Sequence, residues 1–358
     1  MTRRPIVIVA ALVLVAGVAV NGAWYYARHL ALDAVDRWVA EQRDSGTAIE
    51  WAERRVTGWP LRLDGLFTAP RAAMATPGRT LRWQGPDTGV RFYLFAPDTI
   101  DFGAPGQHRL FIEEDGAIAD FTLDAATLDA RADTSLTGLA ATDITAGGTG
   151  LALRGPGDAP VATAKALQLY WQQPATVPAP PIADAPLPVT LQAALRVDGL
   201  TLAPGMLPPV PAPILGNEIA VLRINLAVNG ALDPRRPPAD ALAEWRDNGG
   251  TIDVGKLEIA WGPVRLAGDG TLALDAALQP EGAFAARVSG LTEMLTALEN
   301  AAMIDARTAA IARITLAVLT RPAENGGPPE ARVPLTIQAG TLSVGPVALL
   351  KLPKVTWR

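Results

Sequence analysis

The sequence contains no cysteine. Without thiols the chain forms no disulfide framework, binds no zinc through thiolates and has no cysteine nucleophile. The absence of cysteine is compatible with an oxidising compartment. Only two histidines are present, His29 beside an apolar N-terminal run and His108 in a strand-like segment. A serine–histidine system would depend on His108, and no Gly-x-Ser-x-Gly motif accompanies it, so we expect His108 to be an ordinary strand or surface residue.

Charged residues are also scarce, at 19% of the chain, while hydrophobic residues make up 49%. This balance excludes a disordered protein. The formal net charge is −5, and Arg3 and Arg4 are the only charges before residue 28, so the body is more acidic still. Such a body is repelled by phosphate backbones, and we expect no nucleic-acid partner. The 31 prolines and 33 glycines divide the apolar sequence into many short segments, as in β-rich proteins.

Residues 1 to 27 form the longest apolar run, MTRRPIVIVAALVLVAGVAVNGAWYYA. The uncharged part is long enough to cross the hydrocarbon layer of about 30 Å as a helix. Trp24, Tyr25 and Tyr26 at its end are typical of a membrane interface. The pattern predicts a transmembrane anchor with the body outside the cytoplasm, and a cleaved signal peptide is the alternative. Residues 28 to 46 follow as an amphipathic stalk helix that Gly46 ends.

From residue 47 onward, short alternating segments predict a mainly β protein, a β-rich α+β fold of elongated, curved antiparallel sheets. A proline-dense stretch at residues 174 to 189 predicts a linker between an N-terminal lobe, residues 47 to 173, and a C-terminal lobe, residues 190 to 358. Residues 250 to 290 read as a β-meander, with a capped helix before it and a helix from Leu291 after it. Residues 309 to 320 remain ambiguous between helix and strand, and the chain ends in a hairpin.

One short pattern recurs along the chain. LRLDGLFTAP at residues 61 to 70 and LRVDGLTLAP at residues 195 to 204 share eight of ten letters. A catalytic pair of Asp64 and Asp198 is one interpretation. Related polar–Gly pairs occur at Thr137-Gly138, Asn229-Gly230 and Ser289-Gly290, and these polar residues share turn-forming ability and little acid–base chemistry. The interchange favours strand exits or tight bends with glycine at positive φ.

Other candidate sites are weak. Glu113, Glu114 and Asp115 are compatible with calcium binding but more typical of a solvated hairpin tip. The glycine-rich residues 146 to 150 lack a P-loop lysine. We expect no cofactor and no metal.

Strand-like segments also contain tryptophans. We expect these side chains to pack in the core, and the more specific alternative is that they line a ligand groove. They are Trp51, Trp59, Trp83, Trp171 and Trp261.

Several of these segments resemble known families. The anchor, TGWPLRLDG at residues 57 to 65 and VPLTIQAGTLSVGP at residues 333 to 346 resemble an uncharacterised family of proteobacterial envelope proteins. The C-terminal part, with GDGTLALD at residues 268 to 275 and VSGLTEMLTALEN at residues 288 to 300, is similar to AsmA-like proteins. This resemblance implies an inner-membrane anchor, a periplasmic body of curved β-sheets, and a role in lipid transport or envelope maintenance. It implies no catalytic residues.

Three functions remain open from the sequence. The first is a non-enzymatic protein, anchored once in the inner membrane with its body in the periplasm, that binds a lipid or another hydrophobic envelope component on an apolar sheet face. The second is a scaffold that binds another envelope protein by edge-strand pairing. The third is an envelope hydrolase that uses carboxylates.

Overall fold

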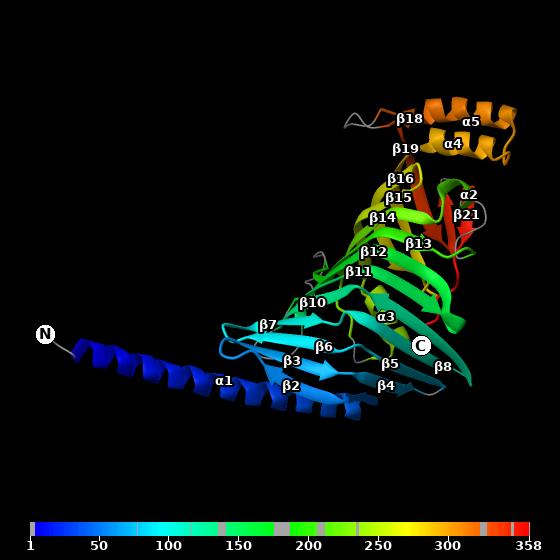
Figure 1. The fold of residues 1–358 in the computed structure, drawn as a ribbon. Coiled ribbons are helices and arrows are strands. Elements are labelled where there is room, and N and C mark those ends of the chain that lie inside the picture. The colour runs from blue at the N-terminus through cyan, green and yellow to red at the C-terminus, as the bar shows by residue number, and fades with distance from the viewer. Residues whose placement is uncertain are drawn as a thin grey trace. The chain divides into compact units, whose positions relative to one another are not determined.

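The computed structural model describes residues 4–76, 78–114, 116–134, 141–174, 187–205, 212–233, 236–322, 328–344 and 347–357 (Figure 1). The chain divides into two compact units. Unit 1 comprises residues 1–141 and 146–160, and unit 2 comprises residues 142–145 and 161–358. Both units consist mainly of β-strands, and every strand pairing with a defined register is antiparallel. The prediction of a mainly β, antiparallel fold is confirmed.

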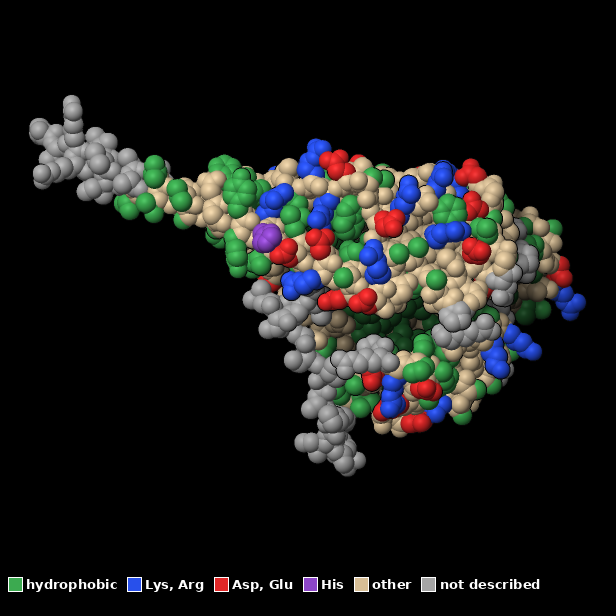
Figure 2. Space-filling model, turned by 90° about the horizontal axis from the view of Figure 1, so that it is seen from below, with side chains coloured by type: hydrophobic (Ala, Val, Ile, Leu, Met, Phe, Trp, Pro, Cys, Tyr) green, Lys and Arg blue, Asp and Glu red, His purple; other side chains and the backbone are tan. Residues whose placement is uncertain are grey.

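Helix α1 (Arg4–Asp44) opens unit 1 as one continuous helix, in which the expected anchor and stalk segments are joined. Its end was predicted correctly: Ser45 and Gly46 form the turn after it, and Gly46 has a φ of +89°. The second half of α1 packs on the strands, and the first half projects beyond them (Figures 1 and 2). In the part of the chain that the structure describes, no helix is both long and apolar enough to cross a membrane.

The strands of unit 1 form a meander of long hairpins, and the hairpin arms bend about halfway along their length, so that each bent arm contributes two strands. On one side of the bends the sheet contains β2, β3, β6, β7 and β10, and on the other side it contains β1, β4, β5, β8, β9 and β11. Bends lie at residues 51–52, 69–70, 85–87, 104–105 and 126, and three of these five bends contain a proline. Backbone bonds such as Gly85 N to Pro70 O, at 2.9 Å, continue the pairing across the bends. The strand bounds are β1 Thr47–Glu50, β2 Glu53–Thr57, β3 Arg62–Thr68, β4 Arg71–Thr76, β5 Arg79–Gln84, β6 Thr88–Tyr93, β7 Ala96–Gly103, β8 Gly106–Glu114, β9 Ala117–Ala125, β10 Thr127–Thr134 and β11 Ala141–Gly155, which the short helix η1 (Pro156–Asp158) follows.

Unit 2 is an antiparallel meander in which each strand from β12 to β16 pairs with the next along the chain, and β17 then pairs with β19 (Figure 1). Between β17 and β19 the chain inserts helices α4 and α5, which pack side by side. The bounds are β12 Ala159–Gln172, β13 Val189–Leu202, β14 Glu218–Asn229, β15 Thr251–Trp261, β16 Val264–Leu274, β17 Pro280–Ser289, β18 Thr320–Arg321, β19 Glu330–Gln338, β20 Thr341–Val344 and β21 Val347–Lys351, with helices α2 Ala212–Leu215, α3 Pro238–Asp247, α4 Leu291–Asn300 and α5 Ala306–Leu319.

Most expected elements of unit 2 are present. The meander over residues 250–290 corresponds to β15, β16 and β17, the capped helix to α3, and the helix from Leu291 to α4. The ambiguous residues 309–320 lie almost wholly in α5, whose N-cap Asp305 accepts a hydrogen bond from Thr308 N at 2.7 Å. The closing hairpin is formed by β19 and β20, with β21 added as a further strand.

The expected linker at residues 174–189 does not separate the two units. Most of it, residues 175–186, lies outside the described residues, but the strands on either side, β12 and β13, pair directly from Ala162–Leu202 to Gln172–Gln192. The units divide near residue 160 instead. The prolines show only that the stretch is not a central strand. A long connection between two neighbouring strands meets that condition as well as a linker between two lobes does.

Candidate functional site

The repeated motif places Asp64 and Asp198 in similar local settings within different units. In each copy the aspartate accepts a hydrogen bond from the arginine two residues before it: Arg62 Nε to Asp64 Oδ2 at 2.8 Å, and Arg196 Nε to Asp198 Oδ2 at 2.8 Å. Residues two apart in a strand share a face, so the motif builds a local ion pair. Both aspartates of the repeat thus have an arginine partner within their own strand.

The predicted backbone role of the repeat is correct for only part of the set. Asn229-Gly230 and Ser289-Gly290 are strand exits, with φ of +95° at Gly230 and +78° at Gly290. A Cβ at Gly290 would lie 2.0 Å from Pro263 O, so this exit requires glycine. The prediction of a strand exit was wrong for Gly65 and Gly199, which lie inside β3 and β13; the prediction of a positive φ was correct for Gly199, at +60°, but not for Gly65. In both strands the ladder continues past the glycine because the flanking residues remain paired. Thr137-Gly138 lies outside the described residues.

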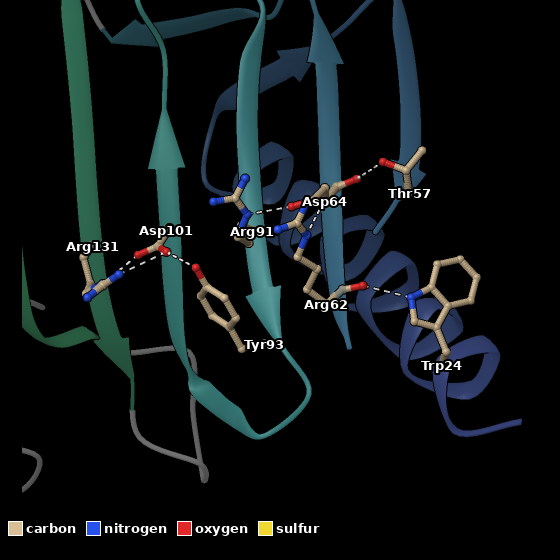
Figure 3. A network of polar contacts seen from close by, with 8 residues as sticks. All are labelled: Trp24, Thr57, Arg62, Asp64, Arg91, Tyr93, Asp101 and Arg131. Carbon is tan, nitrogen blue, oxygen red and sulfur yellow. Dashed lines mark hydrogen bonds and ion pairs between the residues drawn. The ribbon is translucent and has the colours of Figure 1, made fainter. Parts of the chain in front are cut away.

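Asp64 also begins a row of alternating charges across unit 1 (Figure 3). The register aligns Asp64 with Arg91, Arg91 with Asp101, and Asp101 with Arg131. Arg91 Nε donates to Asp64 at 2.7 Å and Arg131 Nε donates to Asp101 at 2.7 Å, while the Tyr93 hydroxyl donates to Asp101 at 2.9 Å. The hydrogen bond from Arg131 lowers the pKa of Asp101 against the opposing effect of burial. Cross-strand pairs of opposite charge stabilise a sheet, which is the role this row performs.

The other candidates for chemistry have structural partners. The His108 ring lies 2.9 Å from Ala104 O through Nε2 and stacks on Trp83 with a centroid distance of 6.0 Å. Glu113 pairs with Arg82 across the β5–β8 ladder at 3.3 Å. Asp115 lies outside the described residues. Among those that are described, no three acidic or histidine side chains form a group able to hold a metal ion.

The predicted groove tryptophans lie in different places. In unit 1, Trp51 packs edge-on against Phe67 with ring centroids 5.0 Å apart, Trp83 stacks on His108, and Trp59 lies in an exposed turn. In unit 2, Trp171 and Trp261 are half-buried strand residues. The three aromatics predicted at a membrane interface also differ: Trp24 is buried, whereas Tyr25 and Tyr26 are exposed.

The most extensive feature that the register reveals is an apolar face on the sheet of unit 2. Directly paired residues in an antiparallel ladder project from the same face, so the pairings can be followed from strand to strand. Three such rows cross β12 to β17 and reach β19 without a polar side chain. They are Leu167-Val197-Leu222-Ile259-Leu266-Val288-Ala331, Leu169-Leu195-Ile224-Leu257-Gly268-Ala286-Val333, and Trp171-Ala193-Leu226-Val254-Gly270-Phe284-Leu335. We call these 21 residues the apolar face.

The same strands present a polar face on the other side. There Arg196 pairs in register with Arg223, and Arg223 donates to Glu258 at 3.0 Å. Lys256 also contacts Glu258, at 3.2 Å. Burial alone raises the pKa of Glu258, but the bonds from Lys256 and Arg223 lower it overall. The alternation thus gives the sheet of unit 2 two chemically distinct sides.

The large side chains of the apolar face are incompletely buried. Leu169, Leu195, Ile224 and Leu257, which follow one another across four strands, all retain partial solvent exposure. No large side chain of the described residues is fully buried. A conventional sheet core covers such residues with a second layer, and burying a large aliphatic side chain completely contributes about 1.5–3 kcal/mol. An apolar partner that covers the apolar face would therefore bury these partly exposed side chains further.

Small residues shape one part of this sheet. Gly270 and Gly282 lie on β16 and β17 so close to the neighbouring backbone that a Cβ on Gly270 would be 2.3 Å from Ala283 O, and a Cβ on Gly282 would be 2.3 Å from Thr271 O. A groove of about 820 Å³ lies over β16, β17 and β19 here. Its lining includes Phe284 and Val333 of the apolar face, but most of it, with Arg287 and Arg332, belongs to rows that the register places on the opposite face.

A family model described as an uncharacterized protein conserved in bacteria (DUF2125) matches residues 24–353. Since the match covers most of the chain, this protein belongs to the DUF2125 family. Searches of curated proteins and of solved structures found no significant match.

Proposed function

We propose that this protein binds a lipid, or another hydrophobic component of the bacterial envelope, on the apolar face of unit 2 and catalyses no reaction. The proposal also includes a single membrane anchor in the N-terminal part of α1, a location of the body in the periplasm, and a curved sheet like that of AsmA-like proteins. The observation that supports binding is the apolar face itself, whose three rows cross β12 to β17 and β19 without a polar side chain.

The ligand class follows from the chemistry of the rows. Aliphatic side chains that project from one broad face match an extended hydrocarbon chain, because burial of apolar surface requires no directional contact. An extended acyl chain is therefore the kind of ligand that fits the apolar face.

Adjacent residues of β14 provide a direct test. Ile224 lies on the apolar face and Asn225, next in the chain, pairs with Lys256 on the polar face. The chain has no cysteine, so Ile224→Cys and Asn225→Cys each introduce one labelling position. A fluorophore at residue 224 is expected to be quenched when the purified protein binds a nitroxide-labelled fatty acid, and the one at residue 225 is expected to stay bright. Equal quenching at both positions, or none at either, contradicts the proposal.

A binding-defective variant completes the test. Leu226→Gln places an amide on the apolar face, whereas Asn225→Gln changes the polar face by one methylene. Mass spectrometry of lipid that copurifies with the full chain should show a marked loss for Leu226→Gln and none for Asn225→Gln. Far-UV circular dichroism of both variants checks that the sheet is intact.

A further inference from the structure

We propose that the turns at one end of unit 1 form a docking surface for the lipid bilayer interface. The surface consists of Tyr25 and Tyr26 on α1, Trp59 and Leu61 in the turn between β2 and β3, and Phe95 in the turn between β6 and β7, and we call it the aromatic tip. It lies wholly in unit 1, and it rests on the membrane anchor of the proposed function but not on the apolar face of unit 2.

The side chains of the aromatic tip are strongly exposed. Phe95 is 86% exposed, Trp59 57% and Leu61 54%. The two turns contain no charged residue, since residues 58–61 read Gly-Trp-Pro-Leu and residues 94–95 read Leu-Phe. Large apolar side chains grouped at exposed turns mark a binding surface.

Specific hydrogen bonds join the tip to α1. Trp24 Nε1 donates to Arg62 O at 2.9 Å (Figure 3), and Trp59 Nε1 donates to Asn21 Oδ1 at 3.1 Å. Leu94 N donates to Leu61 O at 3.1 Å, which holds the second turn beside the first. Both turns are therefore fixed alongside residues 21–24 of α1.

The position of the aromatic tip along α1 indicates that a lipid bilayer is the partner that contacts it. The exposed apolar side chains of α1 that precede the tip include Leu12, Leu14, Val18 and Val20. Val20 and Trp24 are about 6 Å apart along the axis at 1.5 Å per residue. An interfacial apolar surface enters the headgroup and acyl boundary by about 5–10 Å. A bilayer that covers the apolar run of α1 consequently reaches the tip.

The composition fits the same occupant. Tyr25 and Tyr26 are 63% and 66% exposed, and amphipathic rings such as these prefer the boundary between hydrocarbon and headgroups. The charged row of unit 1 begins just behind the turns, at Arg62 and Asp64. The end of the unit therefore changes from apolar to charged along the strands, as a bilayer surface requires.

Single cysteines in the full chain test the tip. Phe95→Cys probes it, and Ile118→Cys is the matched control, because Ile118 is an apolar residue, 62% exposed, beside the turn at the opposite end of the strands. Val18→Cys on α1 reports whether the chain contacts lipid at all. Each variant carries an environment-sensitive fluorophore and is reconstituted into vesicles of phosphatidylethanolamine and phosphatidylglycerol with nitroxide-labelled lipids.

We expect blue-shifted, strongly quenched emission at residues 18 and 95 and unquenched, water-like emission at residue 118. Water-like emission at residue 95 while residue 18 is quenched overturns the proposal, as does equal quenching at residues 95 and 118 or no quenching at residue 18. A residue 95 probe that is shielded in native membranes but not on pure lipid assigns the tip to a protein partner. Loss of fatty-acid quenching at residue 224, without change at residue 95, separates failure of the proposed function from failure of this one.

Discussion

Trp245 of α3 gives the sharpest test of how unit 2 is held together. Its side chain is only 3% exposed, and Nε1 donates to Asn229 O at 2.9 Å. The indole lies against Gly230 and Gly250; a Cβ on Gly250 would be 2.2 Å from Trp245 Cε2. In a unit whose apolar face is incompletely buried, this contact fixes α3 to the ends of β14 and β15.

The expected losses in the free energy of unfolding follow from these contacts. Trp245→Ala removes a buried aromatic side chain and should lower the free energy of unfolding by about 3–5 kcal/mol. Trp245→Phe keeps most of the ring but loses the hydrogen bond, at a cost of about 0.5–1.5 kcal/mol plus a smaller packing loss. Gly250→Ala forces a methyl group into the indole and should cost about 1–3 kcal/mol.

The decisive measurement is the free energy of unfolding of the double variant that combines Trp245→Ala with Gly250→Ala. In the Trp245→Ala background the space opposite residue 250 is empty, so Gly250→Ala should cost far less, which gives a coupling of about 1–3 kcal/mol. Urea denaturation of the full chain, followed by far-UV circular dichroism, supplies the four free energies. Additive costs in the cycle, or a Trp245→Ala variant within 1 kcal/mol of the parent, would refute the reasoning.

Other predictions concern the backbone contacts and the ion pairs. Gly270→Ala should destabilise unit 2 by about 1–3 kcal/mol in the same urea assay, because the new Cβ meets Ala283 O, whereas Gly255→Ala, with open space at its Cβ, should cost clearly less. The lowered pKa of Asp101 means that its ion pair stabilises the folded state above the unfolded pKa of about 3.9 and that this contribution is lost as pH falls through the folded value. Asp101→Asn should therefore be less stable than the parent at pH 7, by up to about 1 kcal/mol, and the difference should shrink in denaturation curves measured toward pH 2; a constant difference would contradict the assignment. Trp24→Phe should release the turn at Arg62 and increase amide hydrogen exchange there without changing exchange in β14.

The sequence was sufficient for the fold class because alternation is strong in single strands. In β14 the apolar Leu222, Ile224 and Leu226 alternate with Arg223 and Asn225, and the structure places the two sets on opposite faces. Helix α4 was predictable for the same reason, since Leu291, Met294, Leu295 and Leu298 have helical spacing.

Register was not predictable from the sequence. The three rows of the apolar face depend on which residue of one strand lies opposite which residue of the next, and alternation within a strand fixes the face but not the partner. The prediction that a polar–Gly pair ends a strand failed at Gly65 and Gly199 for a related reason. A polar–Gly pair favours a turn locally, but continued pairing on both sides of it retains the strand.

The roles of the tryptophans depended on tertiary contacts as well. Trp24 and Tyr25 are adjacent in the sequence and both suit a membrane interface, yet Trp24 is buried against the turn at Arg62. Trp59 has the alternation of a strand residue, but the turn at residues 58–61 exposes it. Local sequence gives the chemistry of these side chains, but tertiary packing determines that Trp24 is buried while Trp59 is exposed, although both indoles donate a hydrogen bond.

The two proposals assign different lipid contacts to different units, which makes them separable. The aromatic tip offers a few exposed rings at the ends of turns, suited to a bilayer surface, whereas the apolar face offers aliphatic rows across seven strands, suited to a single extended chain. Phe95→Ser should therefore weaken the contact of the aromatic tip with vesicles and leave copurifying lipid on unit 2 unchanged, and Leu226→Gln should do the reverse. If either substitution abolished both properties in a folded protein, a single lipid surface would have to explain them, and the division of roles between the units would be wrong.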